Sequence, residues 1–245
     1  MQNFHIISML PDAFPGILGM SLAGKALGKH WNYTVTNPRD FVERNYKSVD
    51  DEPFGGGIGQ VMRPDILGKA IDNIKAKHNV QKFIYFSPRG KKINYEYIEN
   101  LKSCSDILML CGRYEGIDQR VIDFYEFEEV SLGDFIMSGG EIPAMTLIDA
   151  CIRLIPGVIN NGNALMEESF CSQNEFFGLL EYPLYTRPSS WNGLVVPEVL
   201  TSGDHRKIRE WRLDEAKKIT QKRRPDLWKN FKESKIIGCN EAKYE

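Results

Sequence analysis

Three glycine-rich segments contain the residue types that could bind a ligand. The first spans residues 50–59 (DDEPFGGGIG) and has four glycines within five residues, directly after a run of acids. Glycine tolerates positive φ angles, so the backbone of such a loop can approach a ligand closely. The preceding carboxylates favour contacts with a nucleobase edge over a phosphate cradle. A flexible connector without a ligand is the alternative.

The second and third segments each combine glycine, a carboxylate and an aromatic residue. Residues 111–116 (CGRYEG) directly follow the apolar run 107–110, and residues 131–141 (SLGDFIMSGGE) lead into a long apolar stretch. Backbone groups of such loops can bind the edge of a nucleoside base while apolar side chains cover its faces. The sequence therefore predicts a nucleoside pocket, with tight strand-to-helix turns as the alternative.

The sequence motifs of phosphate-binding loops, metal sites and serine hydrolases are incomplete or missing. Residues 19–26 (GMSLAGKA) have the spacing of a phosphate-binding loop, but Ala26 replaces the hydroxyl that such a loop needs for magnesium. The four histidines show no metal-ligand spacing, and the five cysteines form no Cys-x-x-Cys pair. No Gly-x-Ser-x-Gly elbow occurs. We therefore predict no bound metal and reduced cysteines.

Charge is distributed unevenly along the chain, whose formal net charge is -2. Residues 205–245 contain 13 Lys and Arg against 7 acids, and nine of these cations lie within 205–224. A positive cluster on an otherwise acidic protein indicates a partner with a phosphate backbone. A solvated helix face with local ion pairs is the alternative.

Short apolar runs alternate with amphipathic segments along the first 155 residues. The runs predicted as strands are 4–10, 33–36, 82–87, 106–111 and 130–137. The segments predicted as helices are 13–29, 64–78, 95–103, 117–124 and 141–155. This alternation predicts an α/β domain with a mainly parallel sheet, whose ligands bind beyond the carboxyl ends of the strands.

The second part of the chain has a different pattern. Residues 160–163 are a run of turn formers, and Asp204 is placed to cap a helix that runs to about residue 223. Ile208, Trp211 and Ile219 are predicted to share the apolar face of that helix. We predict one domain over residues 1–159, a flexible linker over 160–170 and a small helical domain over 171–245.

Membrane and secretion signals are not evident in the sequence. The central apolar run 107–111 is far shorter than a membrane span, and residues 1–4 lack the basic and apolar regions of a secretory signal. We expect a cytoplasmic protein without a membrane partner.

Read together and in order, these segments resemble the bacterial tRNA (guanine-N1)-methyltransferase (TrmD) family of the SPOUT class. The matching segments are 37–41, 49–59, 87–90, 111–121, 132–149, 153–158, 185–188 and 208–212. They span nearly the whole chain. The resemblance implies a SPOUT-type parallel sheet with a trefoil knot threaded by residues from about 86 to 143, followed by a small helical C-terminal domain that binds tRNA.

The resemblance also implies a methyl donor, S-adenosyl-L-methionine, held by the knotted domain. The implied donor-binding residues are Ser87, Pro88, Gly112, Glu115, Leu132, Gly133, Asp134, Phe135, Ile136, Met137, Gly139, Gly140 and Pro143. Arg153 matches the family arginine near O6 of the target guanine, and Glu168 falls where the general base is usually aspartate. A role for Mg²⁺ stays open.

The implied substrate is tRNA with guanosine at positions 36 and 37, methylated at N1 of guanosine 37. The implied RNA-binding residues are Asp50, Gly56, Gly57, Gly59 and Arg187. The family further implies a homodimer with active sites shared between subunits. Two alternatives are another SPOUT methyltransferase that acts on a ribose 2'-hydroxyl, and a non-catalytic RNA-binding module.

Overall fold

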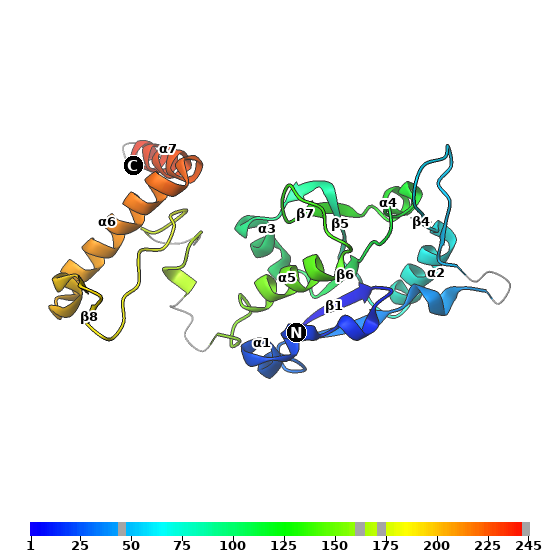
Figure 1. Cartoon of the computed structure of the whole chain (residues 1–245), viewed down its shortest axis with the longest axis horizontal. Helices are drawn as coiled ribbons and strands as arrows, with labels where there is room; N and C mark the ends of the chain where they lie inside the picture. Colours follow the sequence, from blue (N-terminus) through cyan, green and yellow to red (C-terminus); the bar gives the residue numbers. More distant parts are fainter. Residues whose placement is uncertain (44–47, 160–164, 171–174, 242–245) are drawn as a thin grey trace. The chain divides into compact units, whose positions relative to one another are not determined.

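The computed structural model describes residues 1–43, 48–159, 165–170 and 175–241, with side chains up to residue 233. The chain divides into two compact units, Met1–Asn160 and Asn161–Glu245 (Figure 1). Each unit has its own cluster of buried apolar side chains. The predicted turn residues 160–163 lie outside the described residues.

A five-stranded parallel sheet forms the centre of the first unit, so the predicted α/β class is confirmed. The strands, in the spatial order β2-β1-β6-β5-β7, are Trp31–Thr36, Gln2–Ile7, Asp106–Leu110, Lys82–Lys92 and Glu128–Ser131. The carboxyl ends of parallel strands meet at one edge, so the segments that follow them meet there too. The trefoil knot stays a prediction.

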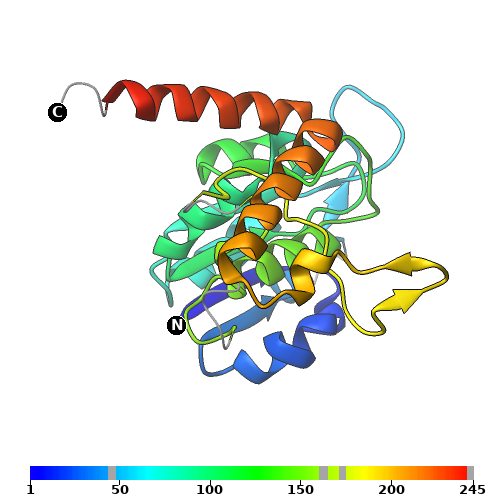
Figure 2. The same cartoon turned by 90° about the vertical axis from the view of Figure 1, so that its left-hand side faces the viewer.

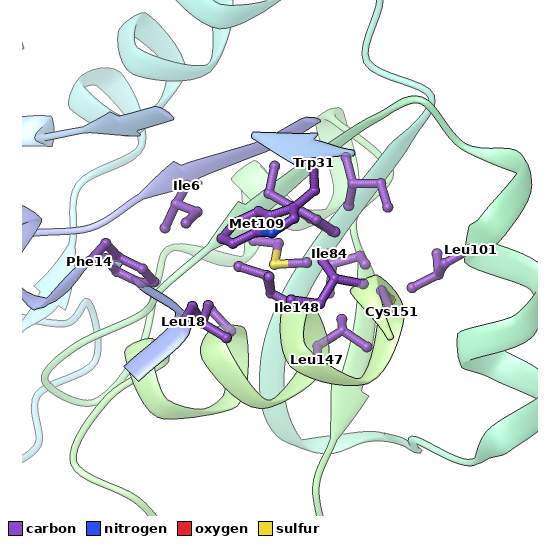
Figure 3. Packing of buried hydrophobic residues seen from close by; sticks show 14 of the residues in the cluster. Ile6, Phe14, Leu18, Trp31, Ile84, Leu101, Met109, Leu147, Ile148 and Cys151 are labelled. Atoms are coloured by element: carbon purple, nitrogen blue, oxygen red, sulfur yellow. The ribbon is translucent and has the colours of Figure 1, made fainter. Parts of the chain in front are cut away.

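Helices cover both faces of this sheet because the side chains of a strand alternate between faces. Ile6 and Met109 point to one face, where α5 (Glu141–Ile152) packs through Leu147 and Ile148 (Figure 3). Ile7 and its neighbours on β6 point to the other face, which is covered by α2 (Pro64–Lys75) and α4 (Gln119–Phe124). Each fully buried Ile or Leu side chain stabilises the folded state by about 1.5–3 kcal/mol relative to leaving it exposed.

The remaining elements of the first unit lie around this core. They are α1 (Ser21–Ala26), α3 (Tyr95–Asn100) and a short antiparallel pair, β3 (Asp50–Asp51) with β4 (Val61–Met62). The short 3-10 helices in this unit are Pro11–Ala13, Gly16–Gly19, Pro38–Phe41 and Leu101–Ser103.

Several predicted elements differ by a few residues from the observed ones, such as the strand predicted over 4–10, which ends at Ile7, and the strand predicted over 82–87, which continues to Lys92. Two predictions differ more. The helix predicted over 13–29 is divided into two 3-10 helices and α1, because Pro15 lacks a donor and Gly16 and Ser21 adopt φ angles of 55° and 53°. The strand predicted over 130–137 ends at Ser131, whose hydroxyl accepts from Gly133 N at 3.1 Å and closes a turn. Residues 132–140 therefore form a loop.

The second unit contains two long helices, a short hairpin and a 3-10 helix, Glu198–Thr201. The long helices are α6 (His205–Arg223) and α7 (Pro225–Glu241), and the hairpin pairs β8 (Ser190–Trp191) with β9 (Leu194–Val195). Figure 2 shows the hairpin extending outward from the unit and α7 leaving the end of α6 in a new direction. The predicted cap is confirmed, since Lys207 N donates to Asp204 Oδ1 at 3.1 Å.

The buried face of α6 differs from the predicted one. Ala216 and Thr220 are fully buried, whereas Ile208, Trp211 and Ile219 are half-buried. The Thr220 hydroxyl donates to Ala216 O at 2.7 Å and accepts from Leu180 N at 2.8 Å, which satisfies this polar group in the core. No described helix is long and apolar enough to cross a membrane.

Candidate active site

An irregular part of β5 and the segments that follow β6 and β7 enclose a hollow at the carboxyl edge of the sheet. The ladder between β5 and β7 is interrupted between Phe86 and Lys91, so Ser87 and Pro88 bulge out of it. The residues lining the hollow are Tyr85–Pro88, Gly112–Gly116, Val130–Gly133, Phe135–Gly140 and Pro143. These residues supply backbone donors and acceptors together with apolar side chains, which is the composition of a nucleoside pocket.

Two glycines allow the walls of the hollow to approach each other. A Cβ on Gly140 would lie 2.6 Å from Cys111 Cα and 3.1 Å from Gly112 N. A Cβ on Gly112 would lie 2.8 Å from the Tyr85 ring. The backbones of the second and third glycine-rich segments are therefore in contact at Gly140, where a side chain would separate them, whereas a side chain at Gly112 would displace the Tyr85 ring.

A buried polar network supports these loops from behind. The Glu141 carboxylate is 5% exposed, accepts from the Ser8 hydroxyl at 2.8 Å and lies 3.7 Å from the Arg113 guanidinium. Arg113 also donates to Ser138 O at 2.9 Å. Burial, together with the charge of Glu141, raises the pKa of the Cys111 thiol well above its usual range, so this cysteine is not a nucleophile.

The first glycine-rich segment begins and ends at the rim of the same hollow. Glu115 N donates to Gln60 O at 3.0 Å, and a Cβ on Gly59 would lie 2.4 Å from Glu115 Cγ. Gly56, Gly57 and Gly59 all have positive φ angles, which explains the glycine run. Between them the side chain of Ile58 is 95% exposed, and that of Phe54 just before is 99% exposed. Asp50 lies on β3 at the base of this loop and accepts from the Ser48 hydroxyl at 2.6 Å.

Arg153 lies at the far end of α5 from the hollow. It caps the C-terminus of this helix, whereas Pro143 in its first turn lines the hollow. Around Arg153 is a second, more apolar hollow, formed by Ile17, Met20, Leu22, Ile142, Met145 and Val158 among others. Ile17, Met20 and Ile142 are 74%, 66% and 63% exposed. Such an apolar patch indicates an interaction surface.

Glu168 belongs to the second unit and is half-buried. Its chain neighbours are anchored to residues 179–182: Ser169 Oγ accepts from Glu181 N at 2.9 Å, and Phe170 N donates to Leu179 O at 3.0 Å. The segment that carries Glu168 is therefore part of the fold of this unit. Arg187 is exposed in the same unit.

Comparison with known proteins assigns this arrangement to a family. A profile described as tRNA (Guanine-1)-methyltransferase TrmD matches residues 1–230. The chain belongs to this family. A tRNA (guanine-N(1)-)-methyltransferase of Wolbachia pipientis wMel is 52% identical over 226 residues, covering 92% of this chain and 94% of that protein.

Two further relatives are similar to this chain. Enzymes with the same name from Ehrlichia canis (strain Jake) and Ruegeria sp. (strain TM1040) are each 48% identical, over 226 and 232 residues. They cover 92% and 94% of this chain, and 94% and 93% of their own lengths. Methyltransferases of this family use S-adenosylmethionine as methyl donor.

The structure gathers the implied donor residues at the first hollow with one exception. Asp134 is 83% exposed and bonds Lys92 Nζ at 2.6 Å instead of lining the hollow. Tyr85 and Phe86, which are not among the implied donor residues, also line it, as do Arg113 and Tyr114 of the second glycine-rich segment. The signal that could have found them is their position at or just after the ends of the predicted strands 82–87 and 106–111. Arg153 lies on the second hollow, and Glu168 and Arg187 lie in the second unit.

Many cations of the basic helix are paired with acids. Arg209 pairs with Glu175, Arg212 with Glu167, and Lys218 with Glu215. Lys207, Lys217 and Arg224 pair with Asp204, Asp214 and Asp226. Within the part of the chain that the structure describes, Arg206, Lys222 and Arg223 have no acidic partner. These three are the cations of α6 that remain available for phosphates.

One histidine cluster lies away from these sites. Ligand atoms of His5, His78 and Asp106 lie within 4.8 Å of one another. Both ring nitrogens of His5 are already bonded at 2.9 Å, to the Thr34 hydroxyl and to Asp106 Oδ1. The imidazole therefore belongs to a hydrogen-bond network, and the predicted absence of a metal stays a prediction.

Proposed function

We propose that this chain transfers the methyl group of S-adenosyl-L-methionine to N1 of guanosine 37 in tRNA. The observation that carries the proposal is the convergence of the irregular part of β5 and the segments after β6 and β7 on one hollow. Membership of the TrmD family supports the reaction, because the related proteins are named tRNA (guanine-N(1)-)-methyltransferases.

The residues of the first hollow fit a nucleoside derivative such as the donor, which is an adenosine that carries a methylsulfonium group. Close packing at Gly112 and Gly140 leaves backbone groups accessible, and Leu132, Ile136 and Met137 provide apolar surface. When bound, the donor supplies an electrophilic methyl group on a sulfonium. The task of the protein loops is to hold that group in one orientation and to exclude water from it.

Glu168 and Arg153 have complementary roles in this proposal. Guanine N1 carries a proton at neutral pH, and its removal leaves negative charge on O6. The Glu168 carboxylate takes the proton from N1 as the new N–C bond forms. The Arg153 guanidinium, which stays charged throughout, stabilises the charge that develops on O6.

The position of Arg153 supports an active site shared between two chains. Pro143 and Arg153 are ten residues apart on α5, which corresponds to about 15 Å at the helical rise. One guanine cannot touch both the donor end and the arginine end of the same helix. The exposed apolar surface around Arg153 offers a two-fold contact that would bring Arg153 and Glu168 of one chain to the donor hollow of its partner.

Exchange between two defective chains tests this sharing. Ile136→Arg places a cation in the hollow at an exposed position and should repel the sulfonium, whereas Glu168→Ala removes the base. In a mixed dimer both defects fall in one site, so random exchange should restore about a quarter of parent activity. Exchange is verified by native mass spectrometry, and background activity after complete exchange would contradict the shared site.

The second unit is proposed to bind tRNA. The available cations of α6 and Arg187 lie in residues 171–245, whereas residues 1–159 hold the donor hollow and the loop with Asp50, Gly56, Gly57 and Gly59. We propose that this loop contacts the guanosines at positions 36 and 37. The trefoil knot and a cytoplasmic location belong to the same proposal, and a need for Mg²⁺ is tested by adding EDTA to the assay.

Product analysis tests the reaction. Unmodified tRNA is incubated with labelled donor, digested to nucleosides and separated by chromatography. The proposal predicts label only in 1-methylguanosine. Label in a 2'-O-methylated nucleoside would identify the alternative SPOUT reaction. Donor and tRNA binding without transfer would identify a non-catalytic RNA-binding module.

A further inference from the structure

A compact set of contacts surrounds Glu167, the residue next to the proposed base. Oε2 of Glu167 accepts from the Tyr182 hydroxyl at 2.5 Å and from Arg212 Nη1 at 3.1 Å. The Arg212 guanidinium also lies over the Tyr182 ring, 4.9 Å from its centroid. Three side chains from three separate segments are thus joined at one carboxylate oxygen.

Hydrogen bonds to charged groups are the stronger kind, and the planar guanidinium suits simultaneous pairing and stacking. Tyr182 is 7% exposed, and Arg212 Nε is buried without a hydrogen-bond partner among the described residues. Tyr182 is therefore shielded from water, whereas the side chains of Arg212 and Glu167 are 37% and 35% exposed. Both donors bind Oε2 of Glu167, so this carboxylate is engaged in the contacts beside Glu168.

The contacts on either side of Glu168 restrict its backbone. Glu167 is held by Tyr182 and Arg212, while Ser169 and Phe170 are bonded to the backbone of Glu181 and Leu179. Leu180 N in turn donates to the buried Thr220 hydroxyl of α6. Residues 167–170 are therefore tied to the 179–182 segment and, through it, to α6.

Charge supports the same arrangement. The carboxylates of Glu167, Glu168 and Glu181 act on one another, and burial followed by the charges of Glu168 and Glu167 raises the pKa of Glu181. Arg212 opposes this rise. The nearby Arg209 also acts on Glu167, but its own ion pair is with Glu175. Arg212 thus contacts this acidic group directly, through Glu167.

We propose that Glu167, Tyr182 and Arg212 form a clamp that positions Glu168 for proton removal. Arg212 is then a positioning residue for the chemical step, although it lies in the basic helix and has the residue type of a phosphate contact. The inference rests on the proposed role of Glu168 as the base.

Two variants of the same helix separate these roles. Arg212→Met removes the clamp cation, and Arg209→Met makes the same chemical change three residues earlier, where the guanidinium is 61% exposed. Single-turnover methylation at saturating tRNA gives the rate, and filter binding gives the tRNA Kd. A misplaced catalytic group costs on the order of 10²-fold, so Arg212→Met should lower the rate by about 10- to 100-fold with little change in Kd. Arg209→Met should retain the parent rate.

A pH profile provides a readout that loss of folding would not mimic. Arg212 opposes the rise in the pKa of Glu181, so its removal favours the protonated form of this neighbour of Glu168. The pH profile of the rate should therefore change in Arg212→Met, and Arg212→Lys should restore the parent profile. Tyr182→Phe keeps the ring and removes one hydrogen bond, so it should reduce the rate by about 3- to 10-fold while the second unit stays folded, with only a small fall in Tm.

The outcomes are distinct. A raised Kd with the parent rate in Arg212→Met would make Arg212 a phosphate contact and overturn the clamp. Parent rates and pH profiles in both Arg212→Met and Tyr182→Phe would overturn it as well. If Glu168→Gln itself methylates at the parent rate, the assignment of the base fails instead, independently of the clamp variants.

Discussion

Substitution of Gly140 by alanine tests the contact between the two glycine-rich walls of the donor hollow. The new Cβ would lie 2.6 Å from Cys111 Cα, whereas ordinary contact begins at 3.4 Å, so the walls must separate by about 0.8 Å. The obstacle is backbone on a fully buried residue rather than the end of a flexible side chain. Overpacking of this kind costs about 1–3 kcal/mol.

The expected loss is measurable in two ways. For a unit of this size, about 2 kcal/mol corresponds to a fall in Tm of about 4–8 °C. Because Gly140 and Gly112 both line the hollow, separation of the walls should also weaken donor binding about tenfold or more, measured by calorimetry. The sequence alone suggests that Gly140 is small to admit the donor. The structure instead attributes the requirement to contact between protein loops.

A matched control is available on α2. A Cβ on Gly68 would meet only the Tyr125 hydroxyl, at 3.3 Å, and the helix interior favours alanine by about 0.5–1 kcal/mol. Gly68→Ala should therefore leave donor affinity unchanged and stability unchanged or slightly higher. If Gly140→Ala matches the parent in both Tm and donor affinity, the packing argument is refuted.

Three further predictions concern the base, the basic helix and a buried histidine. Glu168→Gln should slow single-turnover methylation by about 10² or more with donor affinity unchanged, and Glu168→Asp should keep substantial activity; a parent rate in the Gln variant would move the base elsewhere. Replacing both Arg206 and Lys222 by Met should flatten the slope of log K against log salt by roughly one to two units, whereas an unchanged slope would make these cations a solvated surface. Burial, followed by the charge of His78, lowers the pKa of the buried His5 below 6.5. As pH drops below about 6.5, the unfolded chain therefore takes up a proton before the folded chain does, and the free energy of unfolding should fall. The lowered pKa of Asp106 acts only near and below pH 4; His5→Asn should thus reduce the loss of Tm between pH 7.5 and 5.5, and an equal loss would contradict the assignment.

The sequence predicted the central strand β6 because it is short and almost continuously apolar. Residues 107–110 are buried, on alternating faces, and such a run needs no knowledge of its neighbours to be read as a central strand. The helix predicted over 13–29 failed because helical periodicity continues through Pro15 and Ser21, where the backbone is not helical. The non-helical backbone at these residues prevents one continuous helix although the apolar spacing is helical.

The site was predicted to a different degree in each unit. Residues at strand ends could be placed at one sheet edge, since parallel strands share that edge, but the bulge that turns out Ser87 depends on tertiary contacts. The contacts of Glu167 with Tyr182 and Arg212 join residues 15 and 45 positions apart, so they cannot be predicted from the spacing of neighbouring residues in the sequence. The apolar face of α6 was misassigned because Thr220 is polar yet buried through two hydrogen bonds.

Methylation of tRNA transcripts that differ only at the target position tests the central claim most directly. One transcript has guanosine at positions 36 and 37, a second has adenosine at 37, and a third has inosine at 37, which keeps N1 and O6. With labelled donor, the first should yield 1-methylguanosine and the third 1-methylinosine, while the second should remain unlabelled. Equal labelling of all three transcripts would contradict N1 of nucleotide 37 as the methyl acceptor.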